Sequence, residues 1–144
     1  MLYEFCTSHG VPHILADNLR AAAFGLAYVQ LEDHGLRILR GMEAARGRSA
    51  LIEGIEAVDD DATARLAHAR AVATFDSLQA DTRAVYTGFA EGMNHFIRLH
   101  RSELPAWVRA DFTAHDVLAR DIVWPSAAAI ERFRRQLLAD PRDA

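Results

Sequence analysis

The first eight residues constrain this chain most, because they predict a β-strand that has no evident partner. Leu2 to Thr7 alternate apolar and polar side chains, and Ser8-His9-Gly10 ends the segment. A strand needs neighbours to satisfy its backbone hydrogen bonds, yet the remaining residues contain no convincing second strand. The strand, assigned to 1–8, is therefore expected to need a sheet that the rest of the sequence does not show.

The composition favours helices and excludes two classes of partner. All 16 basic residues are arginine, and alanine, the strongest helix former, is abundant. A formal charge of −4 leaves no basic surface for nucleic acid, and no apolar run approaches the length of a membrane span. The single cysteine, Cys6, excludes an intrachain disulfide. We expect a mostly α fold in a single unit, 1–144, that does not fold stably by itself.

An extended loop is predicted at 9–16, because Pro12 keeps the residue before it out of the helical region, and helix signals follow this loop. Asp17 or Asn18 caps a long helix that ends at Gly47. Two further helices are predicted over 59–78 and 81–100, and a short turn of helix is predicted from Leu104. A Thr113–Asp116 capping box is expected to begin another helix, and a last one is predicted over 126–138. The helical region is thus 17–138, and a frayed tail is expected at 139–144.

No motif within the chain predicts a complete active site. The seven histidines lack the spacing of a metal site, and His95 and His100 are expected on different helix faces. Glu32-Asp33-His34 is interpreted as a polar patch or a buried pair, since successive helical side chains point about 100° apart. Cys6 lacks an adjacent base, and Asp59–Asp61 suit a helix N-terminus better than a calcium loop.

Four blocks of sequence resemble, in order, the α chain of the penicillin acylase family of N-terminal nucleophile hydrolases. They are HGVPHILA at 9–16, AAFGLAYVQLED at 22–33, AARGRSALIEG at 44–54 and DTRAVYTGFAEGMNHFI at 81–97. The resemblance implies a precursor that cuts itself into α and β chains, which together build an αββα sandwich. It implies that the strand at 1–8 completes a sheet of this sandwich that belongs mostly to the β chain. It also implies that the β chain's N-terminal serine is the nucleophile, so that this chain contains no catalytic residue.

The resemblance implies two kinds of site residue. Glu131, in AIERFRRQLL, takes the place of a glutamate that helps bind a structural calcium ion; no organic cofactor is expected. Asp121, Trp124 and Pro125 stand where penicillin-selective members have a methionine, an arginine and a phenylalanine. We therefore expect Asp121 and Trp124 to lie at a substrate pocket that differs from a phenylacetyl pocket, although a plain core role for Trp124 remains the alternative.

The segment LPAWVRADFTAHDVLA, 104–119, resembles the branch of the family that hydrolyses acyl-homoserine lactones and fatty-acyl lipopeptides. The expected protein is an αβ amide hydrolase of that type, acting on an N-acylated small molecule. A β-lactam acylase is the second reading, and a non-catalytic helical interaction subunit is the third. The resemblance implies a periplasmic or secreted location, although no signal peptide is visible in the sequence and the cytoplasm is not excluded.

Overall fold

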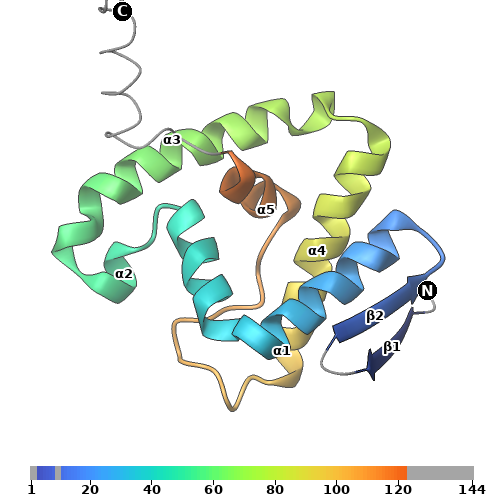
Figure 1. The fold of residues 1–144 in the computed structure, drawn as a ribbon. Helices are drawn as coiled ribbons and strands as arrows, with labels where there is room; N and C mark the ends of the chain where they lie inside the picture. Colours follow the sequence, from blue (N-terminus) through green and yellow to red (C-terminus); the bar gives the residue numbers. More distant parts are fainter. Residues whose placement is uncertain (1–2, 9–10, 123–144) are drawn as a thin grey trace, which may run out of the picture.

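The computed structural model describes residues 3–8 and 11–122, which form a hairpin followed by a set of helices (Figure 1). The mostly helical fold is confirmed. The elements are β1 (Tyr3–Ser8), β2 (Val11–Ala16), α1 (Leu19–Ala45), α2 (Ala50–Glu53), the 3-10 turn η1 (Ile55–Ala57), α3 (Val58–Thr74), the 3-10 turn η2 (Phe75–Ser77), α4 (Ala80–Leu99) and α5 (Ala114–Asp121). The helix predicted over 126–138 lies outside the described residues.

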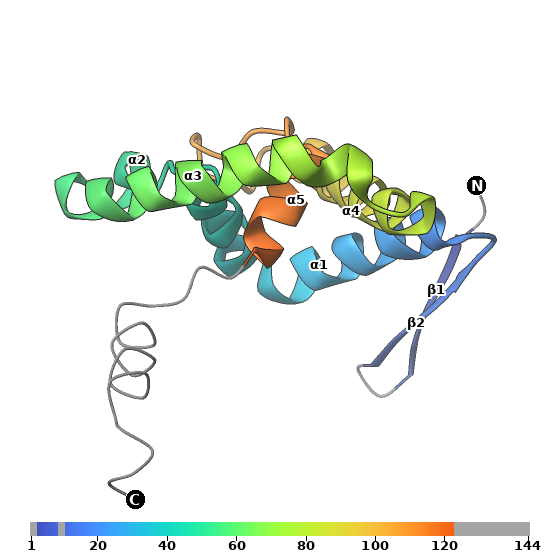
Figure 2. The ribbon, with the colours of Figure 1, turned by 90° about the horizontal axis from the view of Figure 1, so that it is seen from above.

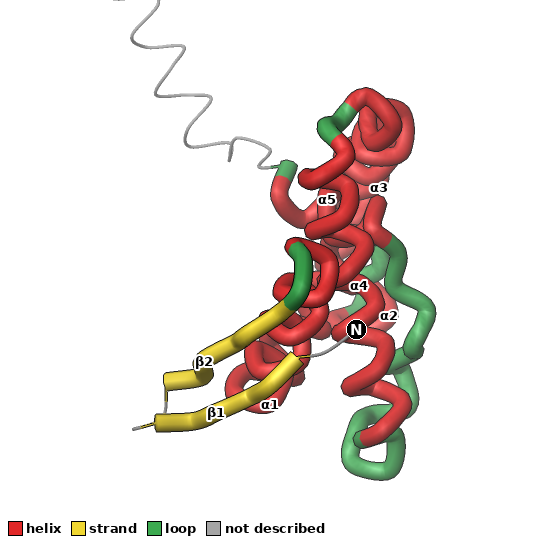
Figure 3. The backbone as a smooth tube through the Cα atoms, turned by 90° about the vertical axis from the view of Figure 1, so that its right-hand side faces the viewer, coloured by secondary structure: helices red, strands yellow, loops and turns green. Residues whose placement is uncertain are grey.

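The expectation of a loop at 9–16 was wrong, because Val11–Ala16 form a second strand. β2 pairs antiparallel with β1, with Tyr3 opposite Ala16 and Ser8 opposite Val11. Pro12 lacks a backbone N–H, but an edge strand tolerates this, and proline also holds Val11 in an extended conformation. Figures 2 and 3 show that this two-stranded sheet projects from one side of the helices.

The centre of the core is the contact between α1 and α4, which cross at close range. Gly88 and Gly92 of α4 lie against the backbone of α1, where added Cβ atoms would overlap the carbonyl groups of Arg20 and Phe24. Ala27, which is fully buried, packs beside Gly92. Small residues of α1, among them Ala23 and Ala27, also permit this close approach. Buried apolar side chains continue the contact: Leu31, Leu39, Met42, Met93 and Ile97.

Helix α1 begins and ends as predicted but is bent in the middle. The Asn18 side chain caps it by accepting a hydrogen bond from the Ala21 N–H at 3.0 Å. His34 has non-helical angles (φ −135°, ψ 20°), next to Gly35, a weak helix former. The two halves of α1 therefore run in different directions (Figure 1).

Gly47 and Asp61 shape the turn that follows α1. Gly47 has φ +66°, and a side chain there would collide with Arg65 and the Asp61 backbone. Asp59, Asp60 and Asp61 lie in the first turn of α3, as predicted. Asp61, however, is buried, and its carboxylate accepts hydrogen bonds from the Ser49 and Ala50 N–H groups at 2.6 and 2.9 Å. The Asp61 carboxylate therefore satisfies two backbone N–H groups at the start of α2, which lie 12 and 11 residues earlier in the sequence.

The turn of helix predicted from Leu104 does not form. Residues 101–113 instead make an irregular connection, in which the Val108 N–H donates to the Pro105 carbonyl at 3.1 Å. Asn94 of α4 holds its far end, since its side chain accepts from the Phe112 N–H at 2.9 Å and donates to the Phe112 carbonyl at 2.7 Å. Val108 and Phe112 are buried, and their burial stabilises this conformation in the absence of helical hydrogen bonds.

Candidate functional site

Helix α5 leads to the predicted substrate-binding residues, and a capping box begins it. The Thr113 N–H donates to Asp116 Oδ2 at 2.7 Å, and the Asp116 N–H donates back to Thr113 Oγ1 at 3.4 Å. The predicted box, with aspartate in place of the usual glutamate, is confirmed. This pairing sets where α5 starts and hence the position of the residues that follow it.

Asp116 also joins α5 to two other helices through a buried ion pair. Arg46, from the end of α1, donates to Asp116 Oδ2 at 2.8 Å and to Asp111 Oδ1 at 2.7 Å. Nε2 of His68, on α3, lies 2.8 Å from Asp116 Oδ1. Burial alone would raise the pKa of Asp116, but the hydrogen bonds from Arg46 and Thr113 and the Arg46 charge together outweigh it, and the pKa falls to about 2.

The other end of α5 carries Asp121, one of the predicted substrate-binding residues. Asp121 is exposed, and its Oδ2 accepts a hydrogen bond from the Tyr86 hydroxyl of α4 at 3.1 Å. Burial, and then the nearby Asp121 charge, raise the pKa of Tyr86, so the phenol remains the donor. Asp121 is therefore held against α4. Trp124, Pro125 and the predicted calcium ligand Glu131 lie outside the described residues.

A groove of about 650 Å³ runs beside this end of α5 and brings α5 together with β2 and α1, which lie near the start of the chain. Pro12 of β2, residues from both sides of the α1 bend, and Arg120 of α5 line it. The bend places Asp33 and His34 on the same groove, a meeting that a regular helix was expected to prevent. Both side chains are exposed, which agrees with the polar-patch interpretation.

Two histidines expected on different helix faces meet at one aromatic ring. The rings of His95 and His100 lie 6.1 and 6.5 Å from the Tyr28 ring, between centroids, and His100 stacks on Phe96 at 4.3 Å. These are packing contacts. Across residues 3–8 and 11–122, no group of three or more His, Cys, Asp or Glu side chains is placed to hold a metal ion. Within the same residues, no helix has the length and apolar character to span a bilayer.

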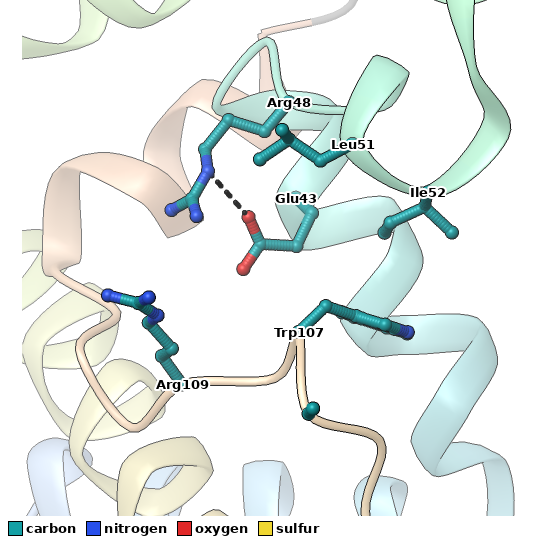
Figure 4. A pocket seen from close by; sticks show the side chains of 7 residues that line it. Glu43, Arg48, Leu51, Ile52, Trp107 and Arg109 are labelled. Atoms are coloured by element: carbon teal, nitrogen blue, oxygen red, sulfur yellow. Dashed lines mark ion pairs between the residues drawn. The ribbon is translucent and has the colours of Figure 1, made fainter.

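A second pocket, of about 230 Å³, surrounds Glu43, which sequence reasoning missed (Figure 4). Its other lining residues include Arg48, Trp107 and Arg109. Glu43 could have been noticed, because it lies four residues after Leu39, on the face of α1 that carries the apolar spacing. A charged residue at such a position is expected to be buried. Its neighbours from the loop at 101–113 carried no comparable signal.

Comparisons with known proteins agree on one family. A family model described as penicillin amidase matches residues 5–138. Aculeacin-A acylase of Actinoplanes utahensis is 32% identical over 123 residues, which cover 71% of this chain and 16% of that protein. The chain thus spans about a sixth of that relative's length.

A solved structure shares the fold. The thermostable penicillin G acylase from Alcaligenes faecalis matches with a TM-score of 0.69 at 21% identity, covering 99% of this chain and 86% of the matched chain. At this identity the match establishes the fold and leaves the choice of substrate open.

Proposed function

We propose, from the premise that this chain belongs to the penicillin amidase family, that it is the α subunit of an amide hydrolase. The family match over residues 5–138 carries the proposal. The resemblance found in the sequence is thereby confirmed at the level of the family. In the proposed reaction, the hydroxyl of the N-terminal serine of a β chain attacks the amide carbonyl, and the amine leaves with a proton. Water then hydrolyses the acyl-enzyme ester, which releases the acid and restores the serine.

The surface of the chain supports the need for a partner. Leu15 is 72% exposed on the outward face of β2, Ile55 is 79% exposed in η1, and Leu66 is 64% exposed on α3. Each strand of the hairpin has one edge that faces away from the other strand. Along that edge, no strand among the described residues pairs with its backbone groups. A β chain that extends this sheet would satisfy the edges, and a layer of the proposed αββα sandwich packed on the face of the sheet would cover Leu15.

The groove beside α5 is the part of this chain that we assign to the substrate. Arg120 of α5 lines it, and Asp121 and Trp124 follow Arg120 in the sequence, so both are proposed to border the acyl group. An acyl-homoserine lactone or a fatty-acyl lipopeptide is the proposed substrate class. The similarity to Aculeacin-A acylase supports an acylase, and the fold shared with a penicillin G acylase keeps a β-lactam substrate as the second candidate.

Two further assignments belong to the same proposal. Glu131 provides a carboxylate, a hard oxygen ligand of the kind that calcium prefers, and the remaining ligands are proposed to come from the β chain. The ion would be structural, and no step of the hydrolysis depends on it. The periplasm or the exterior is the proposed location, because the resemblance implies export.

Expression of the complete precursor tests the proposal directly. We expect intact mass measurement and N-terminal sequencing to find two copurifying chains, the second of which begins with serine. Hydrolysis should then be measured on acyl-homoserine lactones of several chain lengths, a lipopeptide and penicillin G. A single uncut chain, or a cut protein that hydrolyses none of these amides, would favour the non-catalytic interaction subunit and refute the proposal.

A further inference from the structure

The pocket around Glu43 contains a buried acceptor that no described residue satisfies. Glu43 is 2% exposed, and its Oε2 lies 3.3 Å from Arg48 Nε. Oε1 accepts no hydrogen bond from the described residues, since the nearest cationic group, Arg46 Nη1, is 3.8 Å away and the Arg46 guanidinium donates to Asp111 and Asp116. An unpaired buried carboxylate oxygen is costly, so a donor arriving in the pocket would be favoured.

The lining divides into a charged side and an apolar side, with Glu43 between them. In Figure 4 one Glu43 oxygen faces Arg48, while the other points into the space between Arg109 and the start of the Trp107 side chain. Arg48 and Arg109 form the charged side, and Trp107 and Ile52 form the apolar side. Arg109 is exposed, and the ion pairs among the described residues do not include it.

These charges select against simple ions. A bare cation would meet Arg48 and Arg109, and a bare anion would meet Glu43, so each would gain one attraction and suffer one repulsion. A zwitterion gains both attractions. The volume of about 230 Å³ is several times the roughly 30 Å³ share of one water, and it lies below the roughly 300 Å³ at which drug-sized pockets begin. The ligand is therefore a small metabolite with a positive, a negative and an apolar group.

We propose that this pocket binds a free α-amino acid with an apolar side chain. The ammonium group donates to Glu43 Oε1, the carboxylate lies between Arg48 and Arg109, and the side chain packs against Trp107 and Ile52. Three different groups on one carbon then meet three different walls, so the site distinguishes enantiomers. The proposal goes beyond the proposed hydrolase function and does not depend on it, since no bond is made or broken.

Calorimetric titration of the assembled protein with L-leucine and D-leucine tests this site. We expect one enantiomer to bind at least fivefold more tightly and to raise Tm by about 2 °C or more at a concentration well above Kd. Acetate and isoamylamine, which each carry one of the two charges, should bind at least tenfold more weakly. Equal binding of both enantiomers, or no heat from either, overturns the proposal and leaves a pocket filled by water.

Three variants assign the binding to these residues. Glu43→Gln keeps the shape of the side chain but removes its charge, and Arg109→Ala removes an exposed side chain; each should weaken binding at least tenfold. Arg70→Ala, an exposed arginine on α3 outside the pocket, is the matched control and should bind as the parent does. If Arg109→Ala and Arg70→Ala bind alike, the site is refuted. Amide hydrolysis, measured on the same samples, distinguishes the two proposals because either can fail alone.

Discussion

Two of the contacts that α1 makes along its length are stabilised by different kinds of interaction. Its first half meets α4 through backbone, glycine and alanine, with an exposed ion pair between Arg20 and Glu91 at the edge. Its end meets α5 and α3 through the buried Arg46–Asp116 pair. The first contact depends on shape, and the second depends on charge. Substitutions and pH should therefore affect the two ends of one helix differently.

The largest effect is expected at the charged end, from Arg46→Met. The variant leaves Asp116 buried without its cationic partner, and breaking a buried pair by removing one member costs about 3–5 kcal/mol. Arg46 also lies 4.3 Å from the Phe112 ring centre, a contact that is lost as well. Chemical denaturation of the assembled protein measures the change. A loss below about 1 kcal/mol would mean that shape holds this end too.

The next effect is expected at the glycine contact, from Gly92→Ala. A Cβ there would overlap the Phe24 carbonyl and approach the Ala27 Cβ, and relief requires a shift of backbone. Overpacking of this kind costs about 1–3 kcal/mol. Gly35→Ala is the matched control, since open space surrounds that position, and it should be neutral or slightly stabilising. Equal melting temperatures for the two variants would contradict the close approach.

Acid should weaken the charged end by an intermediate amount. Because the folded pKa of Asp116 is about 2, below its usual value of 3.8, this carboxylate stabilises the fold above pH 4 and ceases to do so as the pH falls toward 2. A shift of this size corresponds to about 2 kcal/mol. Denaturation between pH 5 and pH 2, compared with Asp116→Asn, isolates the contribution. Parallel pH profiles for parent and variant would exclude it.

The smallest effect is expected from Glu91→Gln at the exposed edge of the glycine contact. Arg20 and Glu91 have side chains 48% and 38% exposed, and pairs in water contribute below about 1 kcal/mol. Added salt should reduce the difference between parent and variant further. Melting curves in low and high salt measure it. A loss as large as that of Gly92→Ala would show that charge matters at both ends of α1.

Local signals in the sequence were reliable where a residue acts on its own neighbours. The cap at Asn18 and the box between Thr113 and Asp116 depend on side chains reaching backbone groups three residues away, and both were confirmed. The family, and with it the mostly helical fold, was also evident from four ordered blocks. Asp121 was the one predicted site residue within the described part of the chain, and its contact with Tyr86 had no sequence signal.

The sequence by itself thus determined the Asn18 cap that begins α1, the Thr113–Asp116 box that begins α5, and the family, because these follow from spacings of a few residues or from ordered matches. Tertiary structure alone decided that Val11–Ala16 pair with β1, that Asp61 satisfies α2, and that Arg46 joins three elements. It also decided that Glu43 opens into a pocket with an unsatisfied oxygen. Each of these depends on which distant donor or strand edge arrives beside a residue, and packing of the whole chain sets that.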